Sequence, residues 1–114
     1  MPDNRSDILL VNDIFLAMQE IFLFIQDMAY VDFIEDPKTK AAVVRNLEII
    51  GEAAKLVSEE TKLIYKLIEW KEMTALRNKL IHDYFGIDYE IVWSVIQEDI
   101  PHNYELVKKL LSEK

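Results

Sequence analysis

Hydrophobic residues recur at steps of three and four along most of the chain, and no stretch alternates apolar and polar residues with a period of two. The first apolar stripe consists of Ile8, Val11, Phe15, Met18, Phe22, Ile25 and Ala29. This spacing predicts a helix that begins near Ser6 or Asp7. The stripe is widened by Ile14, Ile21 and Met28. A helix apolar over so wide an arc is expected either deep in a bundle or against a second copy of itself.

A second helix is predicted from Asp36 and Pro37, because aspartate is a good N-cap and proline is tolerated at the first helical position. This helix should end between Ser58 and Thr61. Its inner face is expected to carry Val43, Leu47, Ile50, Ala54 and Val57. Small residues around Gly51 leave room for a neighbouring helix to approach closely.

The second half of the chain predicts a short helical piece over residues 62–67, with Trp70 as a large anchor after it. A long helix should run from about Lys71 to Tyr84 and stop at Gly86, which can adopt the positive φ of a residue that follows a helix. Asp88 can cap the last major helix, and Pro101 should bend or restart it. The sequence therefore predicts one all-α domain over residues 1–114, an antiparallel bundle of four or five helices.

Composition narrows the possible chemistry. Hydrophobic residues make up 51% of the chain, enough for one core, and the absence of cysteine rules out thiolate catalysis, disulfides and cysteine-bound metals. The first seven residues lack the features of a secretory signal, and no apolar run is long enough for a membrane span. We therefore expect a soluble cytoplasmic protein that does not contact a membrane.

The net charge of −8 argues against general attraction to nucleic acid. Charge is unevenly distributed, however, because residues 62–82 contain five cations and only two anions. This locally basic segment ends at Arg77-Asn78-Lys79-Leu80-Ile81-His82-Asp83-Tyr84, which concentrates a cation, an amide, an imidazole and a phenol in eight residues. That cluster is the candidate site.

Helical geometry separates two members of the cluster. Asn78 and His82 are four residues apart and share a face, whereas Arg77 lies roughly 140° from His82 around the helix axis. Either the long arginine side chain curls around the helix, or a second subunit places its own motif opposite the first. The second arrangement would give a cleft with two arginines and two histidines.

These residue types suit cleavage of RNA without a metal or other cofactor. Histidine can both accept and donate a proton near neutral pH, and the arginine fork fits phosphate oxygens. His82 could deprotonate a ribose 2′-OH or protonate the leaving oxygen, while Arg77 stabilises charge on the phosphate. Asn78 could hold the phosphate or orient the imidazole. DNA is excluded as a substrate by this route because it lacks the 2′-OH.

Each residue also has a structural explanation. An Arg-x-x-x-x-His spacing often occurs by chance, Asn78 can satisfy a backbone group, and the Tyr84 ring can pack on its own helix. His102 is expected to be solvated near a helix start. Glu48 and Glu52 resemble half of a metal site, but no Glu-x-x-His pattern accompanies them, so a solvated or buried polar role is favoured.

The motif resembles the signature of HEPN-domain proteins of the HepT type, through Arg77-Asn78-x-Leu80-Ile81-His82-x-Tyr84-Phe85-Gly86-Ile87-Asp88. The resemblance extends to Arg45-Asn46-Leu47-Glu48-Ile49-Ile50-Gly51-Glu52-Ala53-Ala54, and to Val92-Trp93 with Asp99-Ile100-Pro101. It covers residues 8–111. One departure is the lack of proline just before Trp70, where the turn could instead be helical.

The resemblance implies a homodimeric helical bundle in which two motifs face one another and form a ribonuclease site. It implies that Arg77 and His82 are the catalytic pair and that Asn78 accompanies them. It also implies a partner, a minimal nucleotidyltransferase antitoxin of the MntA type, which transfers AMP to Tyr84. The added negative charge beside His82 would block and repel RNA.

Two functions therefore remain open. The first is a metal-independent endoribonuclease that acts as the toxin of a toxin–antitoxin pair. The second is a non-catalytic dimeric module that binds a minimal nucleotidyltransferase. The presence of all four motif residues favours the nuclease, whereas the net charge of −8 mildly favours the binding module.

Overall fold

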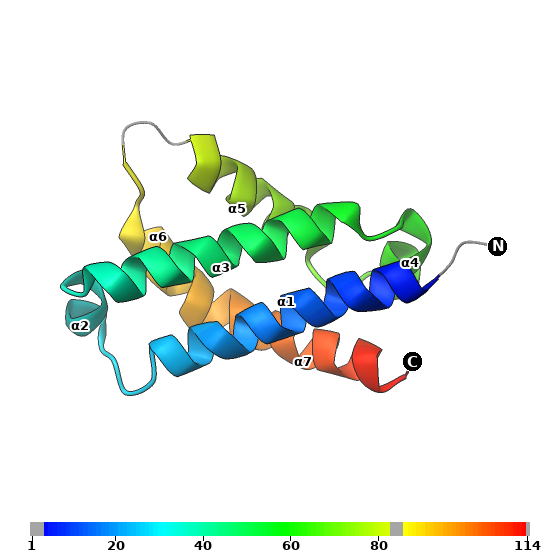
Figure 1. Cartoon of the computed structure of the whole chain (residues 1–114), viewed down its shortest axis with the longest axis horizontal. Coiled ribbons are helices and arrows are strands. Elements are labelled where there is room, and N and C mark those ends of the chain that lie inside the picture. Colours follow the sequence, from blue (N-terminus) through cyan, green and yellow to red (C-terminus); the bar gives the residue numbers. More distant parts are fainter. Residues whose placement is uncertain (1–3, 83–85, 114) are drawn as a thin grey trace.

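Helices account for all the regular secondary structure in residues 4–82 and 86–113, the parts of the chain that the computed structural model describes (Figure 1). They are α1 (Asn4–Phe24), α2 (Tyr30–Ile34), α3 (Pro37–Leu56), α4 (Glu59–Ile64), α5 (Trp70–His82), α6 (Tyr89–Ser94), the π-helical turn η1 (Val95–Asp99) and α7 (Ile100–Ser112). The last three follow one another without a break. The predicted all-α fold is confirmed, and no helix in these ranges is long and apolar enough to cross a membrane.

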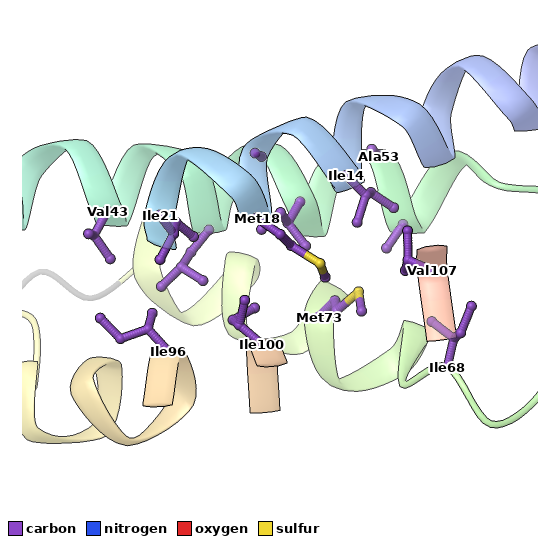
Figure 2. Close-up of a cluster of buried hydrophobic side chains, with 14 of the residues drawn as sticks. Ile14, Met18, Ile21, Val43, Ala53, Ile68, Met73, Ile96, Ile100 and Val107 are labelled. Carbon is purple, nitrogen blue, oxygen red and sulfur yellow. The ribbon is translucent and has the colours of Figure 1, made fainter. Parts of the chain in front are cut away.

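The bundle is organised around α3, which packs against α1 on one side and α5 on the other (Figure 1). α1 also packs against α7. Side chains from these helices meet in one buried cluster, in which Figure 2 shows Met18, Met73 and Ile100 among the members. Burial of this apolar surface is the main force that holds the helices together.

α1 confirms the predicted stripe only as far as Phe22, because the helix ends at Phe24 and Ile25, Met28 and Ala29 lie beyond it. Only part of the helix is covered. Ile14 and Ile21, at its centre, are completely buried. On the opposite face, Leu9, Leu16 and Leu23 recur every seven residues and are 67%, 49% and 68% exposed. α1 is therefore not enclosed by its own chain, and burial against a second copy stays a prediction.

Both predicted helix starts are confirmed. The Asp36 carboxylate accepts a hydrogen bond of 3.1 Å from the Thr39 backbone N–H at the start of α3, and this bond is the main cause of a lowered Asp36 pKa. The Asp88 carboxylate caps α6 in the same way, by accepting a bond of 3.0 Å from the Glu90 N–H. His102 is exposed, as expected.

Some local predictions were wrong or incomplete. α3 ends at Leu56 rather than between Ser58 and Thr61. The short helix lies at Glu59–Ile64 rather than at 62–67, because Ser58 caps it by accepting from the Thr61 N–H. A turn over residues 65–67 follows, so the approach to Trp70 is not helical. α2 was not predicted, since five residues are too few to display a helical period. Pro101 restarts the last helix, directly after η1.

A buried carboxylate joins the start of α1 to the segment that follows α3. Asp7, near the start of α1, is only 7% exposed. It accepts hydrogen bonds from the Ser58 backbone N–H at 3.0 Å and from the hydroxyls of Ser58 and Thr61, both at 2.5 Å. Such charge-assisted bonds offset the cost of burying the carboxylate, and they fix the start of α1 against the turn between α3 and α4.

α3 and α5 approach each other closely at Gly51. A methyl group at this position would overlap the Arg77 Cβ and lie 2.5 Å from the Met73 carbonyl oxygen. Only glycine therefore allows the two helix backbones to approach this closely. The expectation of a close neighbour at Gly51 is confirmed, and the neighbour is the helix that carries the motif.

We predict that Gly51→Ala destabilises the protein by about 1–3 kcal/mol, the usual cost of overpacking a well-packed site. The sign is informative because the same change in an uncrowded helix would stabilise it by roughly 0.5–1 kcal/mol. Urea unfolding followed by circular dichroism measures the difference. Glu52→Ala, at the exposed neighbouring position, is the control and should change stability little. Higher stability of Gly51→Ala would contradict the close crossing.

Candidate functional site

The described part of the motif, residues 77–82, occupies the end of α5, and the inner face of this helix is anchored in the core. Met73 and Leu80 are 7% and 8% exposed. Asn78 and His82 lie one turn apart on the opposite face and are both exposed. No hydrogen bond between described residues involves the His82 imidazole. The ring is therefore open to an incoming group.

Arg77 lies between these two faces and is half-buried. Its Cβ lies against Gly51 of α3. From there the side chain turns towards the outer face, where Nη1 donates a hydrogen bond of 2.9 Å to the Asn78 Oδ1. The arginine thus reaches around the helix as far as Asn78. The meeting of Arg77 with His82, within one chain or between two, stays a prediction. The guanidinium and Asn78 are brought together, whereas no described contact joins either of them to His82.

Arg77 has an N–H donor that is not used within the described structure. Its Nε is buried and has no hydrogen-bond partner among the described residues. No described carboxylate lies within ion-pair distance of Arg77 or His82. A buried donor without an acceptor costs about 1–3 kcal/mol, so such groups call for an explanation such as a ligand. Chemically, the arrangement offers a fixed cation, an amide and an accessible imidazole to an anion.

Tyr84 falls within residues 83–85, outside the described part of the chain. Its predicted roles as the modified residue or as a packing residue are therefore untested. Gly86, which follows, has a φ of +113°. This positive value confirms the expected conformation of the glycine, and a residue with a side chain would be strained there.

The other candidate ligands do not form a metal site. Glu48 is half-buried and lies 3.7 Å from Arg45, while Glu52 is exposed. Within residues 4–82 and 86–113, no three His, Asp or Glu side chains are grouped so that they could hold a metal ion.

Comparison with known proteins places this geometry in a family. Residues 14–110 match the ribonuclease HepT-like family. A protein of Methanocaldococcus jannaschii, provisionally named an RNase, is 41% identical over 101 residues, which cover 89% of this chain and 84% of the relative. The chain belongs to the HepT-like ribonuclease family.

Other HepT-like relatives show similar coverage. A Thermococcus cleftensis protein named "Probable ribonuclease HepT" is 44% identical to this chain. The match covers 80% of this chain and 83% of the relative. A provisional RNase of Caldanaerobacter subterraneus subsp. tengcongensis is 40% identical over 79% of this chain and 80% of its own length. No solved structure matches the chain significantly.

The start of the HepT-like motif helix is held by Asn103 of α7, which is 2% exposed. Its Oδ1 accepts from the Glu69 backbone N–H at 2.9 Å, and its Nδ2 donates to the Glu69 Oε1 and the Asp99 carbonyl, both at 2.9 Å. Burial, followed by the charge of Glu69, raises the Asp99 pKa beside this junction. The Trp70 indole N–H donates to the Tyr65 carbonyl and fixes the preceding turn.

Sequence reasoning overlooked Asn103, although a signal was present. It occupies a position of the apolar stripe of α7, between Ile100 and Val107 at steps of three and four. A polar residue on such a stripe indicates a buried hydrogen-bonding role.

Loss of this anchor should weaken the HepT-like fold. We predict that Asn103→Ala lowers the free energy of unfolding by about 1–3 kcal/mol, because three hydrogen bonds are lost and the buried Glu69 N–H has no acceptor. Thermal and urea unfolding measure the change. His102→Ala is the control, at the adjacent exposed position, and should unfold like the parent. An Asn103→Ala protein as stable as its parent would show that water replaces the anchor.

Proposed function

We propose that this HepT-like protein is a metal-independent endoribonuclease and the toxin of a toxin–antitoxin pair. The observation that carries the proposal is the outer face of α5. There, Asn78 and the exposed His82 are one turn apart, and the Arg77 guanidinium is hydrogen-bonded to Asn78 at 2.9 Å. The names of the relatives support the same class of activity.

In the proposed reaction, the ribose 2′-oxygen attacks the adjacent phosphorus and the bond to the 5′-oxygen breaks. One imidazole accepts the proton of the 2′-OH, and a second donates a proton to the departing 5′-oxygen. Arg77 stabilises the negative charge that builds on the non-bridging oxygens, and Asn78 holds the phosphate or the arginine. The products are a 2′,3′-cyclic phosphate and a 5′-hydroxyl.

The need for two proton-transfer groups favours a homodimer. The motif of one chain contains a single histidine, His82, and the side-chain hydrogen bond of Arg77 and Asn78 in the described structure joins them only to each other. A second copy placed with its motif opposite the first would provide the other imidazole. One histidine would then act as base while its counterpart acts as acid.

Tyr84 is proposed as the residue through which the activity is switched off. It lies two positions after His82 in the sequence. A partner nucleotidyltransferase of the MntA type would transfer AMP from ATP to the phenol oxygen, with release of pyrophosphate. The bound nucleotide would add bulk and negative charge next to the imidazole, and so exclude the RNA phosphate.

We predict that the purified protein cleaves labelled RNA in the presence of EDTA. His82→Ala should lower the rate by about 10²–10⁴-fold, the usual contribution of a general acid or base. Arg77→Ala should lower it by roughly 10²–10³-fold, as for loss of an oxyanion-stabilising donor. The rate is measured by gel electrophoresis of the products, whose ends should be 2′,3′-cyclic phosphates.

His102→Ala and Arg45→Ala are matched controls, since they remove the other histidine and an exposed arginine of α3. Both should cleave at the parental rate. Equal cleavage by all variants would overturn the assigned site. Intact RNA with the parent, together with tight binding of the nucleotidyltransferase, would favour the non-catalytic binding module. A monomer at micromolar concentration in sedimentation would contradict the composite site.

We also predict that incubation with the partner nucleotidyltransferase and ATP increases the mass of the chain by one or more AMP groups and abolishes cleavage. Peptide mapping should place the modification on Tyr84. Tyr84→Phe should gain no mass, whereas Tyr89→Phe, a change at the next tyrosine along the chain, should be modified normally. An AMP group on another residue would show that the assignment of Tyr84 is wrong.

A further inference from the structure

A groove of about 660 Å³ lies beside the candidate site. Its walls are the C-terminal end of α3, α4 with the turn that follows it, and the outer face of α5. Four lysines line it against two glutamates: Lys55, Lys62, Lys66, Lys71, Glu59 and Glu72. In a chain with a net charge of −8, this local excess of positive charge is unusual.

Most of this positive charge is free to act on a ligand. Glu59 lies 3.9 Å from Lys62, but its side chain is 86% exposed. Lys55, Lys66 and Lys71 are exposed and form no ion pair with any described residue. Three unneutralised ammonium groups therefore border one groove.

The groove meets the candidate site at Asn78. The face of α5 that forms its wall carries Lys71, Ala75 and Asn78, at steps of four and three. The next step of four along this face reaches His82. Asn78 thus lines the groove and also accepts the hydrogen bond of Arg77. From Lys71 to His82 the helix rises about 16 Å, which can accommodate several nucleotides of a single strand.

The groove offers little that could read bases. Trp70 contributes to its wall but is only 5% exposed, and its indole N–H is already bonded to the Tyr65 carbonyl. Its ring is therefore not available as a stacking platform, which is how most single-strand binding proteins hold bases. Most of the accessible cationic groups are lysine ammonium groups, which contact phosphates without regard to sequence.

We propose that this groove binds the phosphate backbone of a single-stranded RNA segment and leads the scissile phosphate to Arg77, Asn78 and His82. The inference rests on the proposed ribonuclease function and assigns its substrate-binding track. Because four lysines gather at the groove while the protein as a whole is acidic, RNA should bind there in preference to the general surface. An acidic protein partner is less well matched, since the groove ends at groups suited to a single phosphate.

Binding can be tested apart from cleavage. The full chain with His82→Ala is titrated into fluorescein-labelled single-stranded RNA, and the Kd is measured by anisotropy from low to moderate salt. A triple variant in the same background, Lys55→Gln, Lys66→Gln and Lys71→Gln, should weaken binding at least tenfold. Because each phosphate contact contributes about 0.7 to the slope of log K against log salt, the slope should become flatter by about 2.

The control is a second triple variant, Lys38→Gln, Lys108→Gln and Lys109→Gln, which removes the same charge from exposed lysines outside the groove. It should retain the affinity and slope of its parent. Equal weakening by both triple variants would mean that only the net charge of the protein matters. This result would refute the groove as the RNA-binding site. Unchanged RNA binding by the groove triple, with or without loss of nucleotidyltransferase binding, would also overturn it.

The two proposals fail in different ways. If the wild-type protein cleaves RNA while the groove triple binds RNA as well as the control triple does, only the groove is refuted. If the wild-type protein leaves RNA intact but the groove triple selectively loses affinity, the binding track stands and the nuclease is refuted. Circular dichroism of both triples checks that the helical fold is retained.

Discussion

The close crossing of α3 and α5 at Gly51 is the constraint on which the candidate site depends. A Cβ at this position would overlap the Arg77 Cβ, so the absence of a side chain sets the distance between the two helices. At that distance the Cβ of Arg77 lies in the interface between the helices, and its Nε is buried. The guanidinium is left to reach around the helix to Asn78. A packing requirement in the core thus determines where a surface cation lies.

Two polar anchors hold the helices on either side of this crossing. The Asn103 side chain binds both the backbone N–H and the carboxylate of Glu69, the residue before α5. Asp7 binds the turn that follows α3 through Ser58 and Thr61. Both anchors are almost fully buried, where hydrogen bonds of good geometry offset the cost of desolvation. They hold the segment between α3 and α5 against α1 and α7, and so support the start of α5.

The charge distribution suits a selective enzyme better than a general RNA-binding protein. The net charge of −8 repels polyanions from most of the surface. The groove gathers four lysines, and the Arg77 guanidinium is bonded to Asn78 on its wall. An RNA strand is therefore expected to be attracted most strongly beside the candidate site. α1, which carries the exposed leucines, lies across α3 from α5 (Figure 1).

The sequence by itself determined the all-α fold, the capping residues Asp36 and Asp88 and the motif residues, because helical periodicity and capping depend on neighbours a few positions apart. It also indicated that Gly51 faces a close neighbour. Only the tertiary structure decided that this neighbour is α5, that Asn103 anchors Glu69 and that Lys55 joins lysines of α4 and α5 in one groove. These contacts join residues far apart in the sequence, so no local pattern specifies them, and packing of the whole bundle determines which ones form.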